Sequence, residues 1–305
     1  MTLALQLLTY RRTDVLPALF ESLRAQTDKD WTLYHLDNST NENERIAIQS
    51  YFKSVGSDIP IVTITGKDNL GFAGGHETLF RENNADLVLL LNDDAILEPT
   101  YIETLRQFIV SHEKVAAVEG AVMRWVLDQN GGPKKTDIID TLGFSRSRSG
   151  RVSDISSGRP ACEFVDKFLR DEKVFGVSGC LPMYRRAAVE SLSDGRLFDP
   201  AYTSYKEDVD LAYRLNKNGW EARVVPSAVA YHLRGFDSSR KNRGCSVFAE
   251  SLSLANHWRN LRHTTTAEWL HDGWAIAVFE AAKVLYFIFT KPTVLPRAVS
   301  AFFKK

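Results

Sequence analysis

The sequence predicts an α/β fold with a mostly parallel sheet, and two observations lead to this prediction. Short apolar runs of strand length alternate with helix-length amphipathic stretches through residues 1–125. The composition, with 44% hydrophobic and 25% charged residues and a net charge of zero, is that of a folded globular chain. Strands separated by helices need right-handed crossovers, which set parallel strands side by side and cover both sheet faces. The composition excludes a disordered or collagen-like chain, and three cysteines are too few for a disulfide scaffold.

The expected strands are apolar runs rich in Val, Ile and Leu. They are Leu3–Leu8, Leu33–Leu36, Ile61–Ile64, Leu87–Leu91 and Val115–Val122. The helices expected between them carry apolar residues at roughly helical spacing. They are Val15–Arg24, Glu44–Phe52, Gly75–Arg81 and Tyr101–Val110.

The middle of the chain is rich in Gly, Ser and Arg between Asp128 and Pro160. We expect an excursion or flexible loop there, with a short hairpin around Leu142–Phe144. Regular structure should resume at Val174–Cys180. A helix should then run from about Glu207 to Asn218, with Gly219 just past its end and a short strand at Ala222–Val225.

The net charge of zero conceals an uneven distribution along the chain. Residues 234–305 hold eleven Lys and Arg against five Asp and Glu, a net charge of +6, so residues 1–233 carry −6. We therefore expect an α/β domain at residues 1–235 and a basic, aromatic, helical C-terminal region at residues 236–305.

Polar clusters directly follow three of the expected strands, where ligands of parallel sheets gather. They are Thr9-Tyr10-Arg11-Arg12, Asp37-Asn38-Ser39-Thr40 and Asn92-Asp93-Asp94. Acids at the end of a buried strand need a partner, and a divalent cation carrying a diphosphate is a natural one. The alternative is a solvent-exposed turn that caps the next helix.

Glycines cluster before the third expected helix, in Asn69-Leu-Gly71-Phe-Ala-Gly74-Gly75-His76. Glycine lets a backbone approach a ligand closely, and free N–H groups at a helix entrance suit phosphates or sugar hydroxyls. The spacing differs from the dinucleotide fingerprint Gly-x-Gly-x-x-Gly. A plain glycine turn is the alternative.

Two further groups lie in the second half of the chain. Glu207, Asp208 and Asp210 open the expected helix. The helix dipole alone favours acids there, but one carboxylate could also point into a cleft as a general base, since the three project in different directions. His232 follows another apolar run and is either structural or a ligand for a transition metal.

Together these motifs resemble the family 2-type inverting glycosyltransferases with a GT-A fold, especially their rhamnosyltransferase-like and galactofuranosyltransferase-like branch. The resemblance covers about residues 2–235, and its motifs occur in the family's order. Asn92 departs from the family's Asp-x-Asp motif, and His76 stands where many relatives have Asn.

The resemblance implies a role for each motif. Residues that would bind the nucleotide-sugar donor are Thr9, Tyr10, Arg11, Asp37, Asn38, Asn69, Gly71, Gly74, Gly75 and Asp93. Asp94 and His232 would bind a divalent metal, Mn²⁺ or Mg²⁺, with the histidine favouring Mn²⁺. Asp208 would be the catalytic base. Candidates for the acceptor side are Tyr205, Glu207 and Trp220.

The basic tail contains the apolar run Trp274–Phe289, which is interrupted by Glu280 and Lys283. A bilayer-spanning helix needs about 20 apolar residues, so we expect this segment to lie on a membrane surface. Lys291, Arg297, Lys304 and Lys305 would then face anionic headgroups, with Phe302 and Phe303 dipping in. The alternative is a helix that packs on the catalytic domain or forms a homo-oligomer.

The sequence thus predicts a metal-dependent inverting glycosyltransferase of bacterial surface polysaccharide synthesis. Its donor would be dTDP-rhamnose or a UDP-sugar, and its acceptor a glycan or lipid-linked oligosaccharide, with no nucleic acid involved. A nucleotidyltransferase and an inactive sugar-nucleotide or glycan-binding module are the alternatives.

Cys162, Cys180 and Cys245 show no paired spacing, and the run Leu3–Leu8 is too short for a secretory signal. We therefore expect a cytoplasmic protein, either free or peripheral on the inner membrane.

Overall fold

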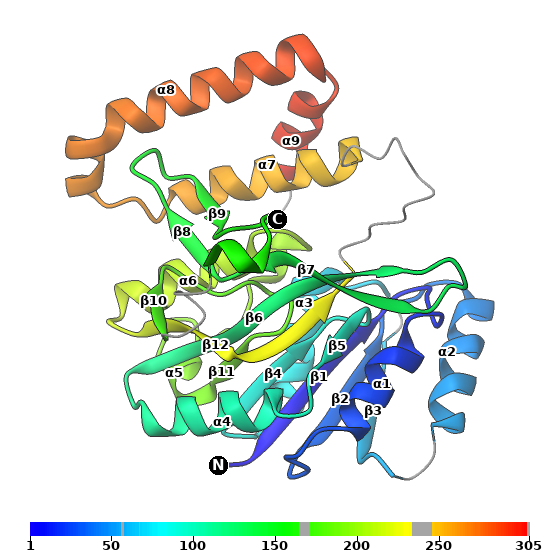
Figure 1. The fold of residues 1–305 in the computed structure, drawn as a ribbon. Coiled ribbons are helices and arrows are strands. Elements are labelled where there is room, and N and C mark those ends of the chain that lie inside the picture. Colours follow the sequence, from blue (N-terminus) through cyan, green and yellow to red (C-terminus); the bar gives the residue numbers. More distant parts are fainter. Residues whose placement is uncertain (56–57, 67, 165–170, 234–245, 304–305) are drawn as a thin grey trace.

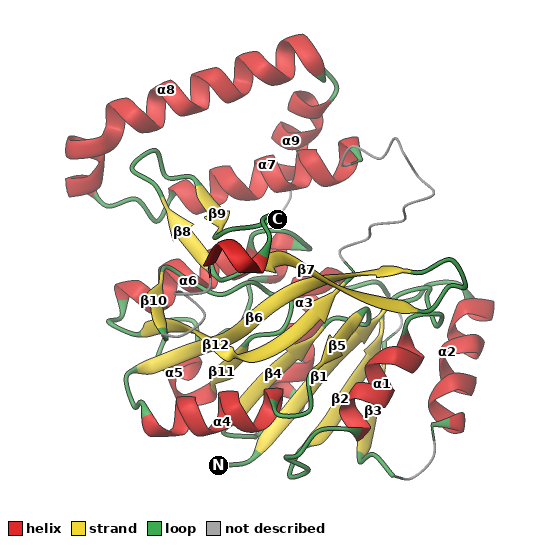
Figure 2. Ribbon diagram, viewed as in Figure 1, coloured by secondary structure: helices red, strands yellow, loops and turns green. Residues whose placement is uncertain are grey.

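A ten-stranded mixed sheet forms the centre of the protein (Figure 2). The computed structural model describes residues 1–55, 58–66, 68–164, 171–233 and 246–303. The sheet contains β1 (Leu3–Thr9), β2 (Thr32–Asp37), β3 (Ile61–Thr65), β4 (Leu87–Leu91), β5 (Ala95–Leu97), β6 (Val115–Leu127), β7 (Pro133–Thr141), β10 (Glu172–Val174), β11 (Met183–Arg185) and β12 (Glu221–His232).

The sheet is parallel where the chain alternates between strand and helix. β4, β1, β2 and β3 lie side by side in this order and in parallel, and β12 runs parallel to β6. The antiparallel β11 joins the two groups by pairing with both β4 and β6. The expected mostly parallel sheet is confirmed, and its parallel strands end at the same edge.

Helices cover both faces of the sheet (Figure 1). One face packs α1 (Leu16–Arg24), α2 (Glu42–Ser54) and α4 (Tyr101–Ser111). The other packs α3 (Gly71–Arg81), α5 (Arg186–Glu190) and α6 (Glu207–Lys217). Alternate side chains of each strand enter the two cores, so Leu87, Leu89 and Leu91 face one layer while Val88 and Leu90 face the other.

The expected strands and helices of residues 1–125 are all present, with ends shifted by a few residues. β6 ends at Leu127 rather than Val122, and α3 begins at Gly71 rather than Gly75, so Gly74 and Gly75 lie inside the helix. Gly219 follows α6 with a φ of +79°, as expected for a residue just past a helix end.

The expectation of a long loop from Asp128 to Pro160 is wrong. β7 pairs antiparallel with the long β6, while β8 (Phe144–Arg146) and β9 (Val152–Asp154) form a separate hairpin. β6 extends to Leu127 and supplies an edge on which the polar β7 can pair. The first residues of β7 are exposed, which explains why they lack the apolar signature of a strand.

β12 is much longer than the strand expected at Ala222–Val225. An irregularity between Val225 and Val229 lets it continue to His232, where it pairs with the short β5. His232 stands opposite Ala95 in this pairing. The ladder therefore brings His232 beside Asp94, although the two residues are far apart in the sequence.

Three helices form a further layer over the site side of the sheet (Figure 1). They are α7 (Val247–Leu261), α8 (Thr266–Thr290) and α9 (Val294–Phe303). α7 and α9 pack together through Leu254, Ala255, Val294 and Ala298. The expected domain boundary at residues 235 and 236 lies outside the described residues, as do Cys245, Lys304 and Lys305.

A buried carboxylate ties α6 to the C-terminal layer. Asp210 is fully buried and accepts hydrogen bonds from Arg214 Nε at 2.7 Å and Arg262 Nη2 at 3.1 Å, and its Oδ1 lies 2.7 Å from His263 Nε2. Tyr202 also donates to it, at 3.1 Å. Although burial opposes ionisation, these partners lower the pKa of Asp210 below its usual range.

We expect Asp210→Asn to destabilise the fold by about 3 kcal/mol or more, because it leaves buried cations without their counter-charge. Urea unfolding measures the loss. Asp137→Asn is the matched control, since Asp137 is exposed on β7 and should change stability by less than about 0.5 kcal/mol. Equal stability of the two variants would contradict the structural role of Asp210.

Candidate active site

The carboxyl ends of β1, β2 and β4 and the end of β12 meet at one edge of the sheet, beneath the C-terminal helices (Figure 1). Ligands of open α/β sheets bind at this edge. Two cavities open there, and most of the side chains singled out by the sequence lie along them or hold their walls.

A histidine–carboxylate pair lies at the first cavity. His232 Nε2 is 3.2 Å from Asp94 Oδ1 and 3.1 Å from Asn92 Nδ2. On its other side, His232 Nδ1 is 2.9 Å from Asp140 Oδ2 on β7. Burial opposes the charged imidazole, but Cys180, Asp94 and Asp140 outweigh it and raise the pKa of His232 well above its usual range.

The donor set of this pair fits a divalent cation. Asp140 holds Nδ1, which leaves Nε2 directed at Asp94, and a second carboxylate that orients a ligating imidazole is the usual arrangement in metal sites. Among the described residues no group of three or more His, Cys, Asp or Glu side chains is placed to hold a metal. Asp94 and His232 would therefore supply two protein ligands, and phosphate oxygens and water the others.

Asp208 opens α6 and faces the same cavity. Its Oδ2 accepts a hydrogen bond from Gly179 N at 2.9 Å, and its Oδ1 accepts from its neighbour Val209 N at 2.8 Å. Burial raises the pKa of Asp208 to about 6, although the two N–H groups oppose this rise. A carboxylate with this pKa is mostly ionised at neutral pH and can accept a proton.

The cavity that joins these groups, the catalytic cleft, has a volume of about 490 Å³. Its lining includes Phe72, Asn92, Ser178, Gly179, Tyr205, Lys206, Glu207, Asp208 and His232. Burial, together with the charge of Asp208, raises the pKa of Glu207 well above its usual range. Of the acceptor candidates, Tyr205 and Glu207 therefore lie on the cleft.

Trp220 does not lie on the catalytic cleft. Its Nε1 donates to Ser191 Oγ at 3.0 Å, and its ring packs against the core beneath α6. It follows Gly219 at the turn from α6 into β12, so its side chain is directed to the packing layer.

A second cavity of about 600 Å³ opens between α2 and the ends of β2 and β3. Asp37, His35, Phe52 and Gly66 are among its lining residues. Asp37 Oδ1 accepts hydrogen bonds from Ser39 N at 2.9 Å and Thr9 Oγ1 at 3.4 Å. In this cavity the nucleobase of a nucleotide could lie beside Asp37.

The other donor-binding candidates hold the loops of this edge together. Asn38 accepts from Leu70 N at 3.2 Å and donates to Gly71 O at 2.9 Å, while Asn69 Oδ1 accepts from Gly71 N at 2.8 Å. Gly71 has a φ of +69°, and a Cβ there would lie 2.4 Å from Thr203 O. The loop before α3 is therefore pressed against the loop before α6.

Gly74 and Gly75 are packing positions within α3. A Cβ on Gly75 would lie 2.8 Å from Leu8 of β1, and one on Gly74 would lie 3.2 Å from Leu70. Both glycines are buried; Gly75 lets α3 approach β1, whereas Gly74 faces Leu70 at the start of its own helix.

Tyr10 and Arg11 follow β1 and Asp93 follows β4 at the same edge of the sheet, and none of the three is among the residues that line the catalytic cleft. Tyr10 is exposed, and the Arg11 guanidinium lies 4.5 Å from its ring centre. Arg11 has a φ of +67° and donates its backbone N–H to Ser39 at 2.9 Å. Burial and the charge of Asp94 raise the pKa of Asp93 to about 7.

Several residues that shape the site escaped the sequence interpretation. Asp140 lies in the stretch expected to be a loop. Asn256 and Asn260 of α7 hold the loop before α6 through hydrogen bonds to its carbonyl groups. Asn256 and Asn260 are four residues apart on the packed side of α7, and His263 follows three residues later, just past its end. This polar row could have signalled a structural role.

The family profile of Glycosyl transferase family 2 matches residues 7–193, which is more than half of the 305-residue chain. A search of curated proteins finds no match. The profile match includes the strand-end clusters and Asp94 but ends before Asp208 and His232.

Solved structures with the same fold include the crystal structure of GalNAc-T7 with UDP, GalNAc and Mn²⁺, at a TM-score of 0.63 and 14% identity over 86% of this chain and 48% of that chain. S. aureus TarS 1–349 in complex with UDP-GlcNAc matches at 0.56 and 14%, over 99% and 79% of the two chains. Mannosyltransferase PcManGT from Pyrobaculum calidifontis, in complex with GDP-Man and Mn²⁺, matches at 0.57 and 14%, over 100% and 88%.

This chain thus spans about half the length of the GalNAc-T7 chain. At such low identity the likeness shows the fold, which is the expected GT-A fold with a helical C-terminal extension. Together with the profile match, it establishes that the chain belongs to glycosyl transferase family 2.

Proposed function

We propose that this family 2 glycosyltransferase moves a sugar, with inversion at C1, from a nucleotide-diphospho-sugar to a hydroxyl group of a glycan or lipid-linked acceptor. The observation that carries the proposal is one cleft lined by both His232, paired to Asp94, and Asp208. This cleft brings a cation site for a diphosphate together with a carboxylate that can accept a proton.

The chemistry assigns a task to each side of the cleft. The acceptor oxygen forms a bond to C1 as the bond from C1 to the diphosphate breaks, and Asp208 takes the proton of the acceptor hydroxyl. Asp94 and His232 would hold Mn²⁺ or Mg²⁺, which would neutralise the leaving diphosphate. The imidazole ligand favours Mn²⁺. Asp37 would bind the nucleobase of the donor in the second cavity.

The Mn²⁺ and the nucleotide or nucleotide-sugar ligands in the structures of GalNAc-T7 and PcManGT, and UDP-GlcNAc in that of TarS, support a nucleotide-sugar donor. Within the family we favour the rhamnosyltransferase-like and galactofuranosyltransferase-like branch, acting in bacterial surface polysaccharide synthesis. Because one cleft combines the proposed cation site with the proposed catalytic base, we favour sugar transfer over a nucleotidyltransferase and over an inactive binding module.

We also propose that α8 places the enzyme on a membrane surface on the cytoplasmic side. By length and composition α8 could cross a membrane. Its exposed face carries an apolar stripe of Leu270, Trp274, Val278, Leu285, Ile288 and Phe289. On the opposite face Glu280 Oε2 accepts from Trp258 Nε1 at 3.0 Å, and its Oε1 lies 2.7 Å from His257 Nε2. This attachment to α7 favours a helix lying flat over one that spans the bilayer.

A thermal-shift screen of nucleotide-sugars tests the donor assignment. At about 100 times its Kd a ligand adds about 2.7 kcal/mol to stability, so a true donor should raise the Tm by several degrees. We expect dTDP-rhamnose or a UDP-sugar to do so with Mn²⁺ and much less with EDTA. If no nucleotide-sugar shifts the Tm in either condition, the proposed function loses its basis.

We expect Asp208→Asn to lower kcat by about 10²–10⁴-fold, the usual contribution of a general base, with donor affinity nearly unchanged. The remote Asp137→Asn is the matched control and should retain wild-type turnover. Because burial raises the pKa of Asp208 to about 6, the wild-type kcat should fall about tenfold per pH unit below that value and level off above it. Wild-type turnover in the Asn variant would refute the assignment.

Trp274→Gln combined with Phe289→Gln should reduce binding to anionic liposomes at least tenfold, since both side chains are largely exposed and would bury apolar area in the bilayer. Co-sedimentation measures the bound fraction. Val110→Gln with Leu127→Gln removes two partly exposed apolar side chains, 44% and 39% accessible, from the α/β domain and is the control. Equal loss in both pairs would contradict a membrane-facing α8.

A further inference from the structure

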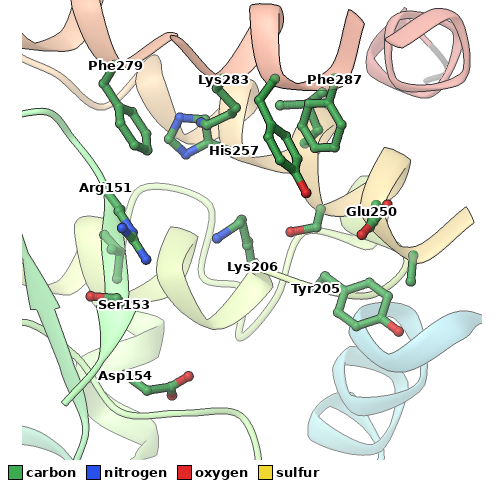
Figure 3. A pocket seen from close by; sticks show the side chains of 15 residues that line it. Arg151, Ser153, Asp154, Tyr205, Lys206, Glu250, His257, Phe279, Lys283 and Phe287 are labelled. Atoms are coloured by element: carbon green, nitrogen blue, oxygen red, sulfur yellow. The ribbon is translucent and has the colours of Figure 1, made fainter. Parts of the chain in front are cut away.

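A cavity of about 890 Å³ lies between the β8–β9 hairpin, the loop before α6, and the helices α7 and α8 (Figure 3). It adjoins the catalytic cleft, and the two share the lining residues Val152, Ser153, Asp154, Tyr205, Lys206 and Ser253. Of the site residues that the sequence singled out, only Tyr205 lines it, and the apolar run of α8 supplies part of its wall. The shared residues connect the cavity with the cleft that Asp208 lines.

Three cations surround the middle of this cavity. Arg151 comes from the hairpin, Lys206 from the loop before α6, and Lys283 from the inner face of α8 (Figure 3). Among the described residues, the side chains of Arg151 and Lys206 make neither a hydrogen bond nor an ion pair. Lys283 donates to Glu280 at 2.9 Å, which leaves two of its three ammonium protons available.

The acids nearby do not neutralise the cations fully. Glu250 lines the cavity but is paired with Lys291, and Glu280 is shared between Lys283, Trp258 and His257. Asp154 lines the end that opens into the cleft. Burial lowers the pKa of Lys283, and the charges of Lys206 and Arg151 lower it further. Like charges gathered in this way favour an anion between them.

The wall beyond the cations is aromatic. Phe279, Tyr286 and Phe287 line the cavity from α8, and in Figure 3 Phe279 and Phe287 stand beside Lys283, on the side away from Asp154. Phe279 and Phe287 are partly covered and lie away from the exposed apolar stripe, while Tyr286 is 53% exposed. An occupant would thus meet apolar rings first, cations next, and the catalytic cleft last.

We propose that this cavity binds the phosphate or diphosphate of a lipid-linked acceptor, an assignment that rests on the proposed glycosyltransferase function. The lipid chain lies against Phe279, Tyr286 and Phe287 and leads to the membrane surface beside α8. Arg151, Lys206 and Lys283 bind the anionic group. The sugar attached to it extends into the catalytic cleft, where its hydroxyl meets Asp208.

Titration calorimetry of the full chain with farnesyl diphosphate tests this assignment. EDTA is present so that the diphosphate cannot bind through a metal at Asp94. Inorganic pyrophosphate carries the charge without the chain, and farnesol carries the chain without the charge. We expect farnesyl diphosphate to bind at least tenfold more tightly than either part, because it engages both halves of the cavity.

Variants locate the binding. Arg151→Gln and Lys283→Gln should each weaken farnesyl diphosphate binding about tenfold, the usual loss of a charge-assisted hydrogen bond. Lys283→Arg keeps the charge and should retain most of the affinity. Lys217→Gln removes an exposed cation at the end of α6 and should have no effect. Circular dichroism checks that each variant is folded.

Three results would overturn the proposal: no binding of farnesyl diphosphate, equal binding of pyrophosphate, or binding that Asp94→Asn abolishes while the cavity variants leave it intact. Equal binding of pyrophosphate would indicate a site for a free phosphate rather than for a lipid headgroup. The thermal shift of the wild-type protein by a nucleotide-sugar with Mn²⁺ distinguishes a failure of the acceptor assignment from a failure of the proposed function. If that shift is present and farnesyl diphosphate fails to bind, only the acceptor assignment is wrong.

Discussion

The site depends on how α7 holds the strained loop that precedes α6. Thr203, Tyr205 and Lys206 all have positive φ values, between 58° and 70°, and such non-glycine conformations cost about 1–3 kcal/mol each. Asn256 Nδ2 lies 2.7–3.0 Å from the carbonyl oxygens of Tyr202, Ser204 and Tyr205, and Asn260 donates to Lys206 O at 3.1 Å. These bonds offset the strain and fix the point where α6 begins. The C-terminal helices therefore belong to the construction of the active site.

The same loop explains the glycine at the opposite wall. Thr203 O accepts from Ala73 N at 3.0 Å and leaves no space for a Cβ on Gly71. Asn38 in turn binds the backbone at Gly71, so the strand ends on the donor side and the start of α6 form one connected framework. The proposed donor site on one side and Asp208 on the other are thus positioned by the same set of backbone contacts. This network of contacts sets the distance between the loop before α3 and the loop before α6.

The sequence predicted the parallel half of the sheet because each of its strands is apolar on both faces, as in Leu87–Leu91. It also predicted one site for Asp94, Asp208 and His232; Asp208 and His232 line one cleft and Asp94 lies beside His232, while their roles stay predictions. It could not predict the place of Asp140 in the site, because β7 forms by pairing with the edge of β6 and its own residues lack an apolar strand pattern. Asn256 and Asn260 escaped for a related reason: their partners are main-chain carbonyl groups, which leave no trace in a side-chain pattern. Gly74 and Gly75 suggested a ligand loop before the helix but lie inside α3, and a role of either in donor binding stays a prediction.

The two faces of α8 link the charge distribution of the chain to its proposed acceptor. One face presents a continuous apolar stripe to the exterior, and the other contributes Phe279, Lys283 and Phe287 to the cavity next to the cleft. Glu280 fixes the rotation of the helix between these faces by bonding His257 and Trp258, since turning α8 would break those contacts. A helix fixed in this way can rest on a bilayer and still form the roof of the cavity. Under the proposed membrane and acceptor assignments, the basic charge of the tail would be divided between the membrane surface and the anion of a lipid-linked acceptor that enters the site from the same side.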